Sequence, residues 1–227
     1  MQDRLIDLLH FFLVETGYAP LLNGKELYKE IWQRFPDKTP VLDEMTFEYL
    51  ERFVVPHKIA VANAGFALMR QPWFQQVFGD CGSPLWYNLI RHDISKFCAS
   101  ECFTYAHFGM PEGSAGVTTH DFILAWHHHK VNNPHHPEHW WSVDRDGSPE
   151  VLPMPAVYVA EMIADWNAAS ETCGIEMGVW MSTNLHSFHF HESTAQLLKT
   201  ALGNLGFMTE YWKMSSGEVW LKYNLKQ

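Results

Sequence analysis

Histidine is concentrated in one short segment, AWHHHKVNNPHHPEHW at residues 125–140, which holds six of the 14 histidines. Three other places offer related donors: His57 in VVPHKIAV, His92-Asp93 in IRHDISKF, and Asp165 in EMIADW. Imidazole nitrogen and carboxylate oxygen together suit divalent Fe, Mn, Zn, Ni or Co. An aspartate can bridge two cations about 3.5–4 Å apart, which can activate a shared hydroxide and hold a phosphoryl oxygen. The residue types therefore predict a site for one or two divalent transition metals.

Each of these pieces lies on or beside a predicted helix, so helices must bring them together. Apolar residues recur at helical spacing in most of the chain, and Pro56 is expected to kink or restart one helix. Pro134 disfavours the helical conformation of Asn133, so the helix that carries the first histidines should end near Asn132, with Thr119 as its cap. The predicted helices are residues 2–16, 23–35, 42–70, 83–97, 119–132, 156–172 and 191–206.

Two segments have the pattern of β-structure instead. Residues 141–155 read as a loop or hairpin with Asp146-Gly147 at the turn. Residues 207–225 alternate apolar and polar side chains around Ser215-Ser216-Gly217, which predicts a C-terminal β-hairpin. The chain is therefore expected to be mainly helical, without the alternating strands and helices of a parallel sheet.

Composition excludes several classes of protein. The chain has 227 residues, 47% of them hydrophobic, and a formal net charge of −10. This acidity excludes a binder of nucleic-acid polymers, which needs a basic surface. No run approaches the roughly 20 apolar residues that span a bilayer, so no membrane segment is expected. The four cysteines form no CxxC pair, which is typical of structural thiols in a reducing compartment.

The motifs resemble two known groups of proteins. HDISK is similar to the H-D-x-G-K signature of the HD-domain superfamily of metal-dependent phosphohydrolases, with Ser95 where glycine is usual. A closer resemblance, over about residues 50–200, is to the bacterial and phage family catalogued as domain of unknown function 5662. It is carried by His57-Lys58, HDISKF, AWHHHKVNNPHHPEHW and MPAVYVAEMIADW. The resemblance implies a mainly α, HD-domain-like helical bundle, to which the small C-terminal β-hairpin is added.

The resemblance also implies which residues act. The expected metal ligands are His57, His92, Asp93, His129, His136 and Asp165. His135 is the alternative to His136, or else a contact to a ligand or to substrate. The residues expected in catalysis are Asp93, Lys96 and Glu161, and those expected to bind substrate are Lys58, Lys96, Asn133 and His135. A second His-Asp pair, His120-Asp121, has a simpler reading, because Asp121 falls in the first turn of a helix and suits its dipole.

The expected function is hydrolysis of a small phosphorylated metabolite, with a nucleotide favoured, by water that one or two divalent metals activate. Two alternatives stay open: an HD-type di-iron oxygenase, and a non-catalytic metal-containing binding or sensor protein. The expected location is the cytoplasm of a bacterium or of a phage-infected cell, and a homodimer is compatible with exposed aromatic residues. The expected organisation is an N-terminal helical extension at 1–48, a helical catalytic domain at 49–205 and the hairpin at 206–227.

Overall fold

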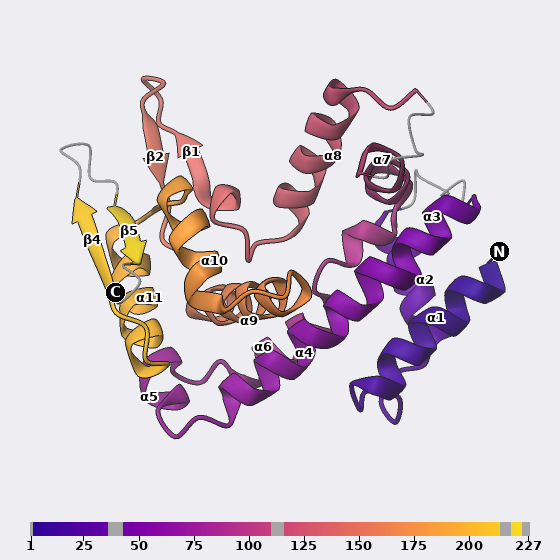
Figure 1. Cartoon of the computed structure of the whole chain (residues 1–227), viewed down its shortest axis with the longest axis horizontal. Coiled ribbons are helices and arrows are strands. Elements are labelled where there is room, and N and C mark those ends of the chain that lie inside the picture. The colour runs from indigo at the N-terminus through magenta and orange to yellow at the C-terminus, as the bar shows by residue number, and fades with distance from the viewer. Residues whose placement is uncertain (1, 36–42, 110–115, 214–218, 224–227) are drawn as a thin grey trace. The chain divides into compact units, whose positions relative to one another are not determined.

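The computed structural model describes residues 2–35, 43–109, 116–213 and 219–223, and these are mainly helical, as predicted (Figure 1). The chain packs into two compact units. Unit 1 consists of Met1–Ala62 and Ile90–Asn133, and unit 2 consists of Asn63–Leu89 and Pro134–Gln227. Each unit combines two separate stretches of the chain, and the predicted division into three consecutive segments stays a prediction.

The described residues of unit 1 form helices joined by turns, with no strand among them. Its helices α1 and α2 pack side by side, as do α7 and α8 (Figure 1). Its elements are α1 (Gln2–Glu15), α2 (Gly24–Arg34), α3 (Glu44–Tyr49), the π-helix η1 (Leu50–Val54), the first half of α4 (Val55–Met69), the 3-10 helix η2 (Ile94–Phe97), α7 (Ala99–Gly109) and α8 (Thr119–Asn132).

Local sequence signals explain where two of these helices begin. The Asn23 side chain accepts from the backbone of Glu26, and the Glu26 carboxylate accepts from the backbone of Asn23, which forms a capping box. Helix α8 has the same arrangement between Thr118 and Asp121. The cap is therefore Thr118 and not Thr119, because the hydroxyl of the residue before the first helical turn is the one that reaches the backbone N–H of Asp121. The predicted end at Asn132 is confirmed.

Pro56 is the second residue of α4, so a new helix starts close to the predicted position, directly after the π-helix η1. The wide turn η1 comes directly before α4, and the N–H of Val55 reaches the carbonyl of Leu50. Proline has no N–H to continue the ladder, and its ring needs room beside the preceding turn. A π-turn gives that room, and such turns are frequent near functional sites. His57 follows immediately.

Unit 2 combines helices with two small antiparallel sheets. Strands β1 (Trp141–Val143) and β2 (Pro149–Val151) form the predicted hairpin, and Gly147 at its turn has φ +81°. β4 (Thr209–Lys213) and β5 (Val219–Tyr223) pair as the predicted C-terminal hairpin, although its expected turn, Ser215-Ser216-Gly217, lies outside the described residues. β3 (His189–Phe190) was not predicted, and it adds to give the order β3-β5-β4.

The helices of unit 2 pack around α9 (Ala156–Thr172), most of whose residues are buried. The unit also contains the second half of α4, α5 (Phe74–Phe78), most of α6 (Gly82–Arg91), the 3-10 helix η3 (Pro137–Trp140), α10 (Met177–Asn184), the 3-10 helix η4 (Leu185–Ser187) and α11 (Glu192–Asn204). Gly65 lets α4 and α6 approach closely, since a Cβ there would lie 2.5 Å from a methyl carbon of Leu89.

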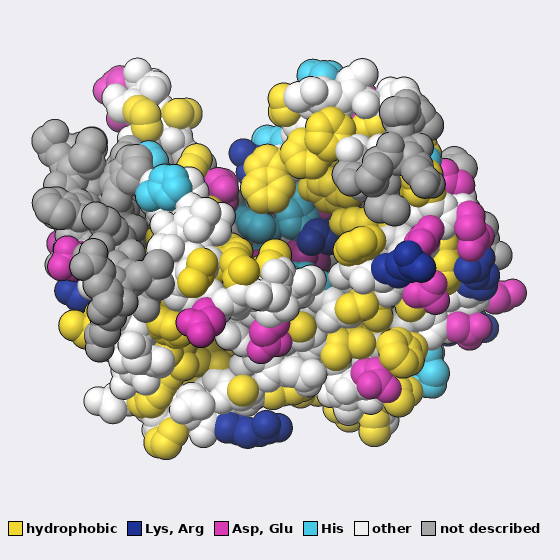
Figure 2. Space-filling view, in the orientation of Figure 1, with side chains coloured by type: hydrophobic (Ala, Val, Ile, Leu, Met, Phe, Trp, Pro, Cys, Tyr) yellow, Lys and Arg dark blue, Asp and Glu magenta, His cyan; other side chains and the backbone are white. Residues whose placement is uncertain are grey.

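Two surface properties bear on partners. Among the described residues, no helix has both the length and the apolar character that crossing a membrane requires. Helix α8 carries the exposed side chains Ile123, Leu124 and Val131, and hydrophobic side chains gather over this helix in Figure 2. The predicted homodimer stays a prediction.

Candidate metal centre

The first group of metal-binding side chains lies in unit 1. His57 is on α4, and His92 and Asp93 follow the last residue of α6. A ring nitrogen of each histidine and a carboxylate oxygen of Asp93 all lie within 4.8 Å of one another. His92 and Asp93 are buried and His57 is half-buried. The structure thus brings together three of the predicted ligands in an arrangement that could hold a divalent ion.

The backbone at Asp93 is unusual. Its φ is +54° and its ψ is +25°, and no other described non-glycine residue has a positive φ. This left-handed conformation costs most residues roughly 1–2 kcal/mol, although aspartate adopts it more often than most. The turn ends α6 and starts η2, so it directs the side chains of His92 and Asp93 from one short stretch of chain toward His57.

Lys58 holds this turn in place from the neighbouring helix. Its side chain is fully buried, and its ammonium donates to the carbonyl oxygens of Ile90, at 3.2 Å, and of His92. The last carbonyls of a helix have no partner within that helix, so the ammonium satisfies groups that burial would otherwise penalise. Lys58 therefore acts on the backbone of the turn, and its predicted contact with substrate stays a prediction.

Lys96 and His129 approach the Asp93 carboxylate from two elements. The Lys96 ammonium, on η2, lies 2.7 Å from one oxygen of Asp93. Nε2 of His129, in the last turn of α8, lies 3.4 Å from the other oxygen. His129 is buried, whereas the Lys96 side chain is 21% exposed. Four of the predicted metal ligands, together with the predicted phosphate-binding lysine, are therefore near one another in unit 1.

Glu101 is a site residue that the sequence reasoning missed. It is fully buried on α7, and its two carboxylate oxygens lie 2.5 Å from Nδ1 of His128 and 2.8 Å from Nδ1 of His129. Burial alone would raise the pKa of Glu101, but hydrogen bonds from the two imidazoles and from Ser95, together with the charge interaction with His129, outweigh it and lower that pKa. The sequence offered one indication of its role, which is that Glu101 is the charged residue among the small and apolar side chains of the segment ASECF, residues 99–103.

Asn133 and Ser95 also lie beside His129. The Asn133 amide donates to Ser95 Oγ and to the backbone carbonyl of His129, each at 2.7 Å. Both residues are buried. The hydroxyl of Ser95 is thus used within the protein. Asn133 was predicted to bind substrate, and that role stays a prediction, while its observed contacts fix the end of α8.

The second group of side chains lies in unit 2. Nδ1 of His135 is 3.2 Å from one oxygen of Glu161, and its Nε2 is 3.8 Å from an oxygen of Asp165. The other oxygen of Glu161 accepts from the Asn88 amide at 3.0 Å. Glu161 and Asp165 are one turn apart on α9, so both carboxylates can face one imidazole. The group combines a buried histidine with two acidic side chains.

His135 and His136 occupy the turn after α8. Their ring centroids are 4.4 Å apart, and the turn is held by Trp140, whose indole N–H donates to the carbonyl of Pro134 at 2.8 Å. His135 is buried beside the carboxylates of α9, whereas His136 is only partly buried. Within unit 2 this geometry favours His135 over His136 as the histidine whose ring nitrogen faces the carboxylate of Asp165. That His136 is a ligand, and that all the predicted ligands share one site, stay predictions.

The protein is therefore mainly helical and has histidine–carboxylate groups that could hold a metal ion. The chain belongs to the family of unknown function DUF5662, which matches residues 45–204. This range contains every residue predicted to bind metal, bind substrate or take part in catalysis. No curated protein and no solved structure matches the chain.

Proposed function

We propose that the protein is a metal-dependent phosphohydrolase that acts on a small phosphorylated metabolite, with a nucleotide as the expected substrate. The observation that carries the proposal is the approach of His57, His92 and Asp93 within unit 1, where donor atoms lie within 4.8 Å of one another. The nucleotide and the HD-domain-like arrangement are inferred from the resemblance of HDISK to the superfamily signature.

The donor set fits a divalent transition metal. Two imidazoles and a carboxylate suit Fe, Mn, Zn, Ni or Co better than Mg or Ca, which prefer oxygen ligands alone. Asp93 is buried, and a buried carboxylate is costly unless cationic groups compensate it. His57, His92 and Asp93 would hold the ion, and His129 would add a further nitrogen.

A bound divalent cation supplies Lewis acidity, which lowers the pKa of water toward neutrality and polarises a phosphoryl oxygen. Lys96 is partly exposed beside Asp93, so its ammonium can offset negative charge on the oxygens of a phosphoryl group. In unit 2, His135 and Glu161 form an imidazole–carboxylate pair that can accept and return a proton. Lys58 contributes by fixing the carbonyl of His92 and so the direction of the turn.

The first experiment measures metal content in the purified full chain. We expect about one or two equivalents of transition metal in the wild type and a large loss in His92→Ala. His120→Ala is the matched control, because it removes an exposed histidine that also precedes an aspartate, and its metal content should equal that of the wild type.

The second experiment measures phosphate release from mono-, di-, tri- and cyclic nucleotides. Activity should require a divalent metal, stop on addition of chelator and be lost in Asp93→Ala, whereas Asp121→Asn in the second His-Asp pair, at the start of α8, should retain it. A folded, metal-loaded wild type that is inactive on the whole panel refutes the hydrolase. Bound iron with an oxygen-sensitive absorbance would then identify the oxygenase alternative, and bound metal without turnover the binding or sensor alternative.

A further inference from the structure

We propose that Glu101 is a positioning residue that fixes the tautomer of His129, so that the Nε2 lone pair of His129 faces the carboxylate of Asp93. The proposal rests on the function proposed above, because the cation that this lone pair would bind is the one assigned to that site. Glu101 would touch neither cation nor substrate, and it would act through the imidazole it holds.

The carboxylate of Glu101 receives one imidazole on each oxygen. Nδ1 of His128 lies 2.5 Å from Oε1, and Nδ1 of His129 lies 2.8 Å from Oε2. An ionised carboxylate only accepts hydrogen bonds, so each imidazole must donate a hydrogen from Nδ1. In a neutral imidazole that carries its hydrogen on Nδ1, the Nε2 atom has a lone pair. Glu101 thus selects the tautomer of two consecutive histidines.

A competing donor near His129 does not change this assignment. Nδ2 of Asn133 approaches Nδ1 of His129 to 3.2 Å, which by itself would suit an unprotonated Nδ1. The amide has two hydrogens, however, and Ser95 Oγ and the carbonyl of His129 accept at the shorter distance of 2.7 Å each. The amide therefore has no third hydrogen for Nδ1. Ser95 Oγ lies farther from Nδ1, at 3.5 Å, than Oε2 of Glu101 does, at 2.8 Å, so the hydrogen of Nδ1 is donated to Glu101.

The opposite edge of the ring then faces Asp93. Nε2 of His129 and Oδ1 of Asp93 are 3.4 Å apart, and in this tautomer both atoms are electron-pair donors. Two ligands that each lie about 2.1 Å from one tetrahedral cation are separated by roughly 3.4 Å. A carboxylate that orients a metal-binding histidine through its other nitrogen typically raises metal affinity 10- to 100-fold. The separation and the tautomer together suit a shared cation.

Glu101 is not itself a metal ligand in this arrangement. Cys98, Glu101 and His128 have donor atoms within 4.8 Å of one another, so these three residues are a further group that could hold an ion. The 2.5 Å between His128 and Glu101 is a hydrogen-bond length, and it is shorter than the roughly 3 Å or more that separates two ligands of one ion. Nδ1 of His128 and Oε1 of Glu101 are therefore joined by a hydrogen bond and not by an ion.

The decisive measurement is the tautomer in the metal-free full chain, which needs no activity. Long-range ¹H–¹⁵N spectra of ¹⁵N-histidine-labelled protein should show a hydrogen on Nδ1 of both His128 and His129, and none on Nε2 of His129, with the signals assigned by His128→Gln and His129→Gln. In Glu101→Gln the amide offers one oxygen and one NH₂ group, so one imidazole must move its hydrogen to Nε2. Hydrogen on Nε2 of His129 in the wild type overturns the proposal.

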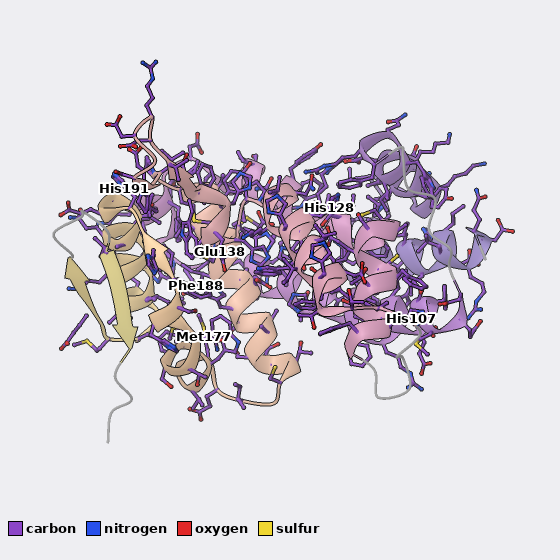
Figure 3. The ribbon with its side chains drawn as sticks, turned by 90° about the horizontal axis from the view of Figure 1, so that it is seen from above. His107, His128, Glu138, Met177, Phe188 and His191 are labelled. Carbon is purple, nitrogen blue, oxygen red and sulfur yellow. The ribbon has the colours of Figure 1, made fainter. Side chains whose placement is uncertain are left out.

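The second readout is affinity for Mn²⁺ or Zn²⁺ measured by calorimetry. Glu101→Gln should weaken binding 10- to 100-fold, and Glu101→Asp should recover part of the loss because it keeps both acceptor oxygens. Asp43→Asn is the matched control, since Asp43 pairs with His107 at 2.8 Å elsewhere in unit 1, and affinity should not change. Figure 3 labels His107 and His128 at separate places in this unit.

The two proposals fail in different ways. A wild type that binds no cation, yet has the expected tautomer of His129, refutes the proposed function and supports the positioning by Glu101. If Glu101→Gln is folded and binds metal as tightly as the wild type, the positioning role of Glu101 is refuted and the proposed function stays supported.

Discussion

The left-handed backbone of Asp93 leads to a prediction about stability that does not depend on activity. In Asp93→Ala and Asp93→Gly the carboxylate is lost equally, so the contact with Lys96 cancels when the two variants are compared. Alanine at φ +54° should cost roughly 1–2 kcal/mol in backbone strain, whereas glycine has none but loses roughly 0.4–1 kcal/mol through the entropy of the unfolded chain. Glycine should therefore give the more stable protein by about 0.5–1 kcal/mol.

The assay is urea unfolding with chelator present, so that bound metal does not contribute to the free energy of unfolding. Position 121 gives the control, because Asp121 lies in the first turn of α8. There Asp121→Gly should be less stable than Asp121→Ala by up to about 1 kcal/mol, since glycine disfavours a helix. The order of the two variants thus reverses between positions 93 and 121. Equal stabilities at position 93, or a more stable alanine variant, would show that the turn is not strained.

Two further predictions concern unit 1. Lys58→Met keeps much of the side-chain volume but removes the ammonium that donates to the carbonyls of Ile90 and His92. The free energy of unfolding should therefore fall by roughly 2 kcal/mol or more. An unchanged midpoint of urea unfolding would contradict the role of Lys58. Burial alone would raise the pKa of Asp43, but hydrogen bonds from Thr46 and the hydrogen bond and charge interaction with His107 outweigh it and lower that pKa below its ordinary value of 3.8. Because the folded-state pKa is the lower one, this stabilisation is present above pH 3.8 and is lost as the pH falls through the folded-state value. The stability of Asp43→Asn, measured between pH 6 and pH 3, should accordingly depend less on pH than that of the wild type, and parallel curves would argue against the assignment.

Local patterns predicted the parts of this fold that are set by neighbouring residues. Asn23 and Glu26 accept hydrogen bonds from each other's backbone, and Gly147 supplies the positive φ of a hairpin turn. The start of α2 and the turn between β1 and β2 could therefore be predicted from a few neighbouring residues. Strand β3 could not, because a two-residue strand has almost no pattern of its own and exists through pairing with β5. The π-turn before Pro56 was missed for a related reason, since its hydrogen bonds leave no spacing signature.

The candidate site shows the same limit. His57, His92 and Asp93 were predicted from residue type and resemblance, and the structure brings them together within unit 1. Glu101 was missed because its meaning depends on a histidine 28 residues away, and only the packing of α7 on α8 brings the two side chains together. In a sequence, a glutamate among apolar residues can have many roles. In the structure, a buried glutamate that accepts hydrogen bonds from two imidazoles has few.

The division of the chain has a consequence for its synthesis on the ribosome. Each unit is assembled from two stretches that are not consecutive, and the changes from one unit to the other fall after Ala62, Leu89 and Asn133. The first 62 residues therefore cannot complete their packing until Asn133 has been translated, and by then Asn63–Leu89 has emerged without the rest of its own unit. A nascent chain stalled before Asn133 would expose apolar surface of both units. Any continuous fragment that contains all of one unit also contains part of the other.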